Sequence, residues 1–289
     1  MRLLKRFIDL ILFGNIWVAL GAVCLYLSSV CQATLFDQHY IAYSALVFFS
    51  TLFIYNFQRV FYKPQTDVSL HSVRRKWIFN NQLPIRILTA IAAIGAAVCY
   101  FYNDPKIIFY FSPLLLLSLA YFIPYVKLRK SPWFKLLTLT LVWTMVTAVV
   151  PVLMSGHSNP ALVKGEILHI FVRFVFMIGI CLPFDIRDME IDRADGVSTI
   201  PLVMGEKGTR LLAIAFMLLY IVLLSAEYFT GMFNLLLFVP LMLSAIINTG
   251  FVFATTSKKS EYFFVAGLDG TMILQYLMIL LTMEFYHHC

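Results

Sequence analysis

The stretch Glu166–Gly196, EILHIFVRFVFMIGICLPFDIRDMEIDRADG, joins an apolar run of bilayer length to a group of acids. Residues 167–184 contain one charged side chain, Arg173, and about 20 such residues cross the hydrocarbon core of a membrane as a helix. Acids then follow within a few residues of one another at Asp185, Asp188, Asp192 and Asp195. The stretch predicts a transmembrane helix that carries an acidic face at the membrane boundary.

The rest of the 289-residue chain has the same character, with 61% hydrophobic residues, 13% charged residues and a mean hydropathy of +0.85. Such a composition indicates an all-α, polytopic membrane bundle, and the long, charged loops predicted on one of its faces suggest a cap over a central cavity. The longest polar stretches, 63–84 and 185–208, are loops, so we expect one domain over residues 1–289. About nine spans are predicted, near 8–30, 38–58, 85–102, 107–124, 133–154, 166–184, 209–227, 232–255 and 262–284.

The positive charges predict the orientation of these spans. Apart from Lys106, Lys164 and Arg173, every lysine and arginine lies at the N-terminus or after an even-numbered span. The positive-inside rule then places the N-terminus and the acidic stretch in the cytoplasm and the C-terminus outside, in a membrane of the bacterial inner type. The net charge of +7 is accounted for by topology and by contact with anionic lipid or substrate, so no nucleic-acid partner is expected.

The acidic face predicts a metal site. On a helix, Asp185, Asp188, Asp192 and Asp195 fall within roughly 80° of one another, whereas Glu190 points away. Clustered carboxylates repel one another unless a positive charge lies among them, and hard oxygen ligands suit Mg²⁺ or Mn²⁺. A bound divalent cation would in turn hold a diphosphate. The alternative is a solvated acidic loop that contributes only to topology or solubility.

The motif Asp-x-x-Asp-x-Glu-x-Asp-Arg from Asp185, followed by Ser198-Thr199-Ile-Pro201 and Gly205, resembles the second aspartate-rich motif of the UbiA-type intramembrane prenyltransferases. The number of spans, their orientation and the basic cluster after span four are also similar to this family. The resemblance therefore covers essentially the whole chain.

The resemblance implies that the protein transfers a prenyl group, an alkyl or aryl group other than methyl, from a polyprenyl diphosphate to an aromatic or lipid acceptor in or near the bilayer. Mg²⁺ (or Mn²⁺) on two aspartate-rich motifs would hold the diphosphate, with the tail in an apolar channel. Asp185, Asp188 and Asp192 would be the catalytic, metal-facing carboxylates and Asp195 a secondary ligand. The phosphates would be contacted by Tyr125, Lys127, Arg129 and Lys130.

The first aspartate-rich motif departs from the family pattern. It should fall on residues 55–63, where Asn56, Arg59 and Lys63 occupy the positions of three acids. These residues share a helical face within roughly 60°, so they form an ordered replacement. One interpretation assigns Asn56, Arg59 and Lys63 to diphosphate binding, with a fixed cation in place of a metal. Others are that Arg59 pairs with Asp188 or Asp192, or that Arg59 and Lys63 are ordinary cytoplasmic anchors.

The loss of these acids keeps two further functions open: a non-catalytic isoprenoid-binding protein, and a cyclase or hydrolase that uses the same diphosphate donor. Charged residues within the spans are costly in hydrocarbon, so we expect Arg173 and Asp269 to face the interior. A buried structural pair is the first interpretation of both, and a role in acceptor binding is the second. The acceptor, the donor chain length and the oligomeric state are not determined by the sequence.

Overall fold

The computed structural model describes residues 2–33, 40–61, 72–103, 105–120, 131–155 and 160–288, and this part of the chain contains helices and no strand. The all-α prediction is therefore confirmed. In chain order the helices are α1 (Arg2–Phe13), α2 (Ile16–Gln32), α3 (Tyr40–Phe61), α4 (Val73–Asn80), α5 (Gln82–Tyr102), α6 (Lys106–Ala120), α7 (Pro132–Thr144), the π-helical turn η3 (Met145–Val149), α8 (Val150–Ser155), α9 (Pro160–Arg187), α10 (Met189–Ala194), α11 (Ile200–Phe229), α12 (Leu235–Ala254), the π-helical turn η4 (Phe263–Leu268) and α13 (Gly270–His288).

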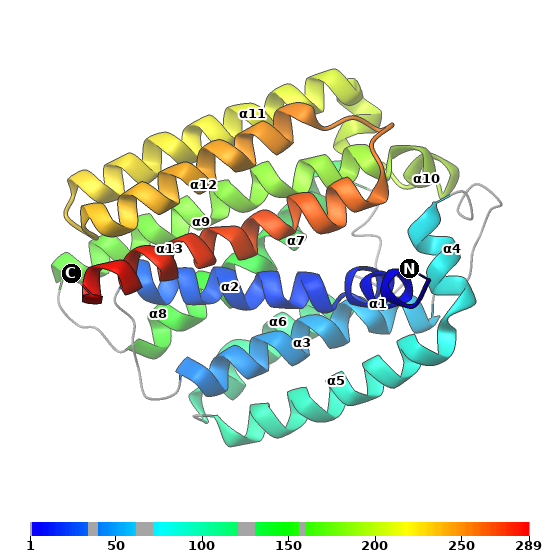
Figure 1. The fold of residues 1–289 in the computed structure, drawn as a ribbon, viewed down its shortest axis with the longest axis horizontal. Coiled ribbons are helices and arrows are strands. Elements are labelled where there is room, and N and C mark those ends of the chain that lie inside the picture. The colour runs from blue at the N-terminus through cyan, green and yellow to red at the C-terminus, as the bar shows by residue number, and fades with distance from the viewer. Residues whose placement is uncertain are drawn as a thin grey trace.

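Each of the nine predicted spans overlaps a helix of the described residues. Within the described residues, seven helical segments are long and apolar enough to cross a membrane, and α1 with α2 forms an eighth that is bent by 52°. The ninth predicted span corresponds to α6, whose apolar part, Phe109–Leu119, is shorter than the others. The long helices run side by side along one direction of the bundle (Figure 1).

The outward side of α5 shows that the bundle is built for lipid. Only 11% of its span is buried, yet the span is strongly apolar. Large apolar side chains recur along its exposed face at Leu83, Ile87, Ile91, Ile94, Val98 and Phe101. A continuous apolar surface of this length is unfavourable in water and favourable in hydrocarbon. The chain is therefore an integral, multi-pass membrane protein.

The bend between α1 and α2 is fixed by a contact from α3. Asn15 adopts the left-handed conformation with φ of 63°, which ends α1 and leaves backbone groups without helical partners. The buried Asn56 side chain compensates, since its Nδ2 donates to the Gly14 carbonyl at 2.9 Å and its Oδ1 accepts from Asn15 Nδ2 at 2.8 Å. Backbone groups freed inside a membrane need such partners. Asn56 thereby ties α3 to the broken first span.

The short helices α4 and α10 lie at one end of the bundle, and α8 and the C-terminus lie at the other (Figure 1). The α4 helix begins at Ser72, whose hydroxyl accepts from the Arg75 amide at 3.3 Å in a typical N-cap contact. At this end, which we call the mouth of the bundle, Arg74 and Arg75 of α4 lie within 3.6 and 3.9 Å of Asp188 and Asp195, which follow α9. Residues far apart in the sequence therefore meet at this end.

Candidate substrate site at the charged end of the bundle

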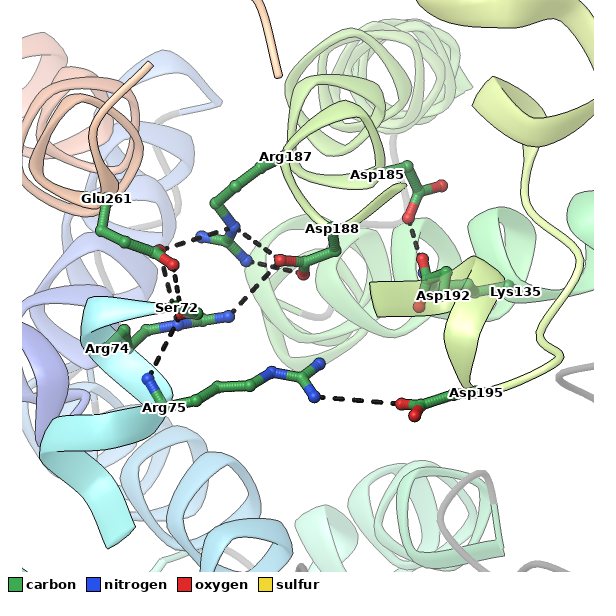
Figure 2. A network of polar contacts seen from close by, with 10 residues as sticks. All are labelled: Ser72, Arg74, Arg75, Lys135, Asp185, Arg187, Asp188, Asp192, Asp195 and Glu261. Carbon is green, nitrogen blue, oxygen red and sulfur yellow. Dashed lines mark hydrogen bonds and ion pairs between the residues drawn. The ribbon is translucent and has the colours of Figure 1, made fainter. Parts of the chain in front are cut away.

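The acidic stretch is divided between two helices. The α9 helix ends at Arg187, Asp188 has φ of −87° and ψ of 4°, and α10 starts at Met189. The Asp192 amide donates to the Asp188 carbonyl at 2.8 Å, which fixes the turn between the two helices. As a result the four aspartates are divided among the surrounding cations: Asp185 and Asp192 face Lys135, Asp188 faces Arg187 and Arg74, and Asp195 faces Arg75 (Figure 2).

Lys135, near the start of α7, bridges two of the predicted metal ligands. Its Nζ lies 2.8 Å from Asp185 Oδ1 and 2.8 Å from Asp192 Oδ2, and all three side chains are nearly buried. Burial raises the pKa of Asp192 above its ordinary value, and the Lys135 ammonium opposes that rise. Two carboxylates from α9 and α10 thus enclose one positive charge.

Asp188 is held by arginines. The Arg187 guanidinium binds both of its carboxylate oxygens, at 2.9 and 2.8 Å, and Arg74 Nη2 lies 3.6 Å from Oδ1. Burial by itself would raise the pKa of Asp188, but Arg187 and Arg74 outweigh this and hold the pKa far below its usual range. Asp188 is therefore a permanent anion at the centre of a basic cluster.

Glu261 completes this cluster from the segment before η4. Its carboxylate lies 3.6 Å from Arg74 Nε and 3.8 Å from Arg187 Nε, and it accepts a hydrogen bond from the Ser72 hydroxyl. Figure 2 shows how the side chain joins α4, the end of α9 and the start of the last span. The contacts draw three helices together over the mouth of the bundle.

Asp195 follows the last residue of α10. Its Oδ2 lies 3.9 Å from Arg75 Nη1, at the long end of ion-pair distances. With this contact, every aspartate of the stretch has a lysine or arginine partner. The positive charge that repelling carboxylates require is supplied by side chains of the protein itself.

Arg59 lines the same site from α3 without such a partner. No hydrogen bond or ion pair joins its guanidinium to the described residues, and its buried Nε has no partner there. The expected pairing of Arg59 with Asp188 or Asp192 is therefore not found, because those acids contact other cations. Burial, together with the nearby Arg74 and Arg75, lowers the pKa of Arg59 to about 9. The side chain stays cationic at neutral pH.

Beneath these charges lies a cavity of about 240 Å³. Its charged lining contains the residues Arg59, Arg74, Arg75, Lys135, Asp185, Arg187, Asp188, Asp192 and Asp269. A second, mostly apolar pocket of about 60 Å³ shares Ile54, Tyr55, Ser118, Val142 and Trp143 with it. The Trp143 indole donates to the Tyr55 hydroxyl at 3.2 Å where the two spaces meet. A charged end thus leads into an apolar interior.

Only some of the predicted site residues line the cavity. Asp185, Asp188 and Asp192 line the cavity together with Arg59, whereas the Asn56 side chain is committed to the bend of the first span. Lys63, Tyr125, Lys127, Arg129 and Lys130 lie outside the described residues. The predicted roles of all these residues remain predictions.

Sequence reasoning missed Lys135, Arg74, Arg75, Arg187 and Glu261 as members of the site. The four basic residues entered only as positive charges that set the topology. Arg187 offered a signal because it directly precedes Asp188, and Lys135 offered a weaker one because it follows span four as the other predicted phosphate-binding residues do. The contacts of Lys135, Arg74, Arg75 and Glu261 depend on packing between segments that are far apart in the sequence.

The geometry fits a divalent cation at one place. Asp185 and Asp192 place two carboxylate oxygens on either side of a single cation, and Mg²⁺ is typically held by one or two carboxylates plus substrate phosphates. Across the described residues no three acidic, histidine or cysteine side chains are already grouped as metal ligands. The first-motif face has no described acid, so the residues there do not fit a second metal.

Taken together, the fold and site define a membrane-embedded protein whose helices enclose a cavity with a charged mouth and an apolar interior. Such a cavity suits an amphiphile with an anionic head. A family model described as the UbiA prenyltransferase family matches residues 82–270, and the chain belongs to that family. Among curated proteins, none matches the sequence significantly.

Solved structures show the same fold. A UbiA homologue from Archaeoglobus fulgidus bound to GPP and Mg²⁺ has a TM-score of 0.66 and 11% identity, with 96% of this chain and 99% of that chain covered. A UbiA homologue from Aeropyrum pernix K1 has a TM-score of 0.63 and 15% identity, covering 92% and 98%. A structure concerning digeranylgeranylglyceryl phosphate synthase has a TM-score of 0.55 and 16% identity, covering 98% and 97%.

Proposed function

We propose that this protein transfers a prenyl group from a polyprenyl diphosphate to an aromatic or lipid acceptor at the membrane. The observation that carries the proposal is the single cavity in which basic side chains and the second-motif acids stand above an apolar space. A diphosphate needs cations, and an isoprenoid tail needs hydrocarbon surroundings. Membership of the family and the GPP-bound homologue support the same donor class.

In this proposal Arg59 binds the donor directly. Its guanidinium lines the cavity, lacks a partner among the described residues and replaces an acid of the first motif. Planar guanidinium groups bind phosphate oxygens through paired hydrogen bonds. A fixed cation at this position takes over the charge that a second metal would supply. Arg74 and Lys135 also line the cavity and add positive charge around the diphosphate.

Asp185 and Asp192, whose carboxylate oxygens now lie on either side of the Lys135 ammonium, would hold a single Mg²⁺. When bound, such a metal would neutralise charge on the leaving diphosphate. The chain's own part is to position the donor: the basic mouth fixes the head, and the apolar lining excludes water from the allylic carbons.

The orientation belongs to this proposal as well. The described lysines and arginines of α4, α7 and α10 gather at the end that carries the site, so we place that end in the cytoplasm and the C-terminus outside. A donor made in the cytoplasm would then reach the basic mouth directly. The chain acts as one domain over residues 1–289, since the site draws on helices from α3 to α13.

The test is pyrophosphate release from geranyl, farnesyl and geranylgeranyl diphosphate by purified protein in lipid, with Mg²⁺ or with chelator. Membrane extract serves as the acceptor source, and Asp192→Asn is the matched inactive variant. Metal-dependent release that Asp192→Asn abolishes is the expected result. Release without any prenylated product would favour a hydrolase or cyclase.

A non-catalytic isoprenoid-binding protein is the second candidate, and one observation favours it. Each of the four aspartates from Asp185 to Asp195 already contacts a lysine or arginine, so the described site supplies positive charge to these carboxylates without a metal. Saturable binding of the three diphosphates, with no release under any condition and no effect of Mg²⁺, would establish this function in place of the transferase.

A further inference from the structure

Asp269, between η4 and α13, has no role in the diphosphate site described above. Its side chain is 8% exposed and lines the cavity, and no hydrogen bond or ion pair joins it to the described residues. The expected pairing with Arg173 is absent, since Arg173 donates instead to Ser29 Oγ at 3.0 Å and to the Leu25 carbonyl. An unpaired carboxyl within a membrane span is costly, so its retention points to a ligand in the cavity.

The position of Asp269 below the charged mouth follows from the spacing of residues along three helical segments. Asp269 follows Glu261 by about two helical turns, and Tyr55 precedes Arg59 by about one. Cys181 similarly precedes Asp188 by about two turns. Tyr55, Cys181 and Asp269 all line the same cavity, so they form one level of its wall. That level lies one to two turns below the cations at the mouth.

This level is where the reacting carbon of a donor would lie. With the diphosphate at the basic mouth and the tail in the apolar pocket beyond Tyr55 and Trp143, the C1–O bond falls between them. When that bond breaks, its electron pair leaves with the diphosphate oxygen. The positive charge left behind is shared by C1 and C3 of the allylic unit. No proton moves in this step.

Resting on the proposed function, we propose that the Asp269 carboxylate faces these allylic carbons and is a catalytic residue that stabilises their positive charge. A fixed charge aimed at developing charge in a cavity shielded from water is among the strongest contributions to catalysis. Arg187 and Arg74 are the positive groups that interact with Asp269, and both lie toward the mouth, where they act on the departing diphosphate as well. The acceptor then supplies the electron pair for the new bond to C1.

The experiment measures ionisation without an acceptor, by positional isotope exchange in geranyl diphosphate labelled with ¹⁸O at the bridging oxygen. Asp269→Asn removes the charge at constant size, Asp269→Glu retains it, and Glu284→Gln changes an exposed acid on the same helix. Affinity for the unreactive thiolo analogue of geranyl diphosphate is measured in parallel. Asp269→Asn should slow exchange on the order of 100-fold, while analogue affinity stays within about twofold.

Asp269→Glu should recover a large part of the exchange rate, and Glu284→Gln should match the wild type. Exchange in Asp269→Asn at the wild-type rate would overturn the inference and leave the proposed function intact. Equal losses of exchange and of analogue affinity would show that Asp269 only shapes the binding site, which also overturns it. Absence of exchange and of pyrophosphate release from the wild-type protein would instead remove the proposed function, and this inference with it.

Discussion

Replacing Lys135 by methionine tests the central ion pairs of the site. The substitution keeps the length and apolar stem of the side chain but leaves Asp185 and Asp192 without the ammonium that lies 2.8 Å from each. Removing one partner from a nearly buried ion pair costs about 3–5 kcal/mol, because the remaining charge is left uncompensated. At about 2 °C per kcal/mol for a long chain, the midpoint of thermal unfolding should fall by roughly 6–10 °C.

The same variant should respond to Mg²⁺ more strongly than the wild type does. With Lys135 gone, the two carboxylates are free to bind a divalent cation, and a ligand at about 100 times its dissociation constant stabilises the folded state by about 2.7 kcal/mol. We therefore expect Mg²⁺ to reverse much of the decrease in the unfolding midpoint of Lys135→Met. We also expect Mg²⁺ to bind Lys135→Met more tightly than it binds the wild-type protein.

The assay is thermal unfolding in detergent with Mg²⁺ or chelator, together with calorimetric titration of Mg²⁺. Lys76→Met is the matched control, because Lys76 is an exposed lysine on α4. A decrease in Lys135→Met no larger than in Lys76→Met would refute the ion-pair argument. Unchanged Mg²⁺ affinity in Lys135→Met would refute the placement of the metal between Asp185 and Asp192.

Three further substitutions address other contacts. Arg59→Ala should weaken donor binding about 10- to 150-fold, which corresponds to the free energy of one hydrogen bond to a charged group. Unchanged donor affinity in an equilibrium binding assay would exclude Arg59 from the site. Asn56→Asp should lower the free energy of unfolding by about 1–3 kcal/mol, because a carboxylate cannot donate to the Gly14 carbonyl; an unaltered unfolding midpoint would contradict this role. His169 Nδ1 lies 3.0 Å from Glu227 Oε1 in the interior. A double-mutant cycle of the two leucine variants should give a coupling energy of about 0.5–3 kcal/mol. Additive effects of the two substitutions on the free energy of unfolding would show that the pair contributes nothing.

The sequence by itself determined the class of fold. Apolar runs of bilayer length identify membrane spans, since hydrocarbon admits only segments whose backbone is satisfied internally. The charge of the connecting segments predicts the orientation, and the motif from Asp185 to Arg193 was sufficient to identify the family. These are local properties of the chain, so they can be predicted before the packing of the helices is known. The predicted replacement of first-motif acids by Asn56 and Arg59 rests on the same kind of local spacing.

Only the tertiary structure decided the partners of these residues. Lys135 joins Asp185 to Asp192, Arg74 reaches Asp188, and Asn56 turns to the bend of the first span, although each pair is far apart in sequence. Helical spacing predicts which side chains share a face but not which helix covers that face. Packing settles that choice, because charged and polar groups buried away from water must each find a partner. The sequence therefore specifies the acids, and the packing of the helices specifies the cations that neutralise them.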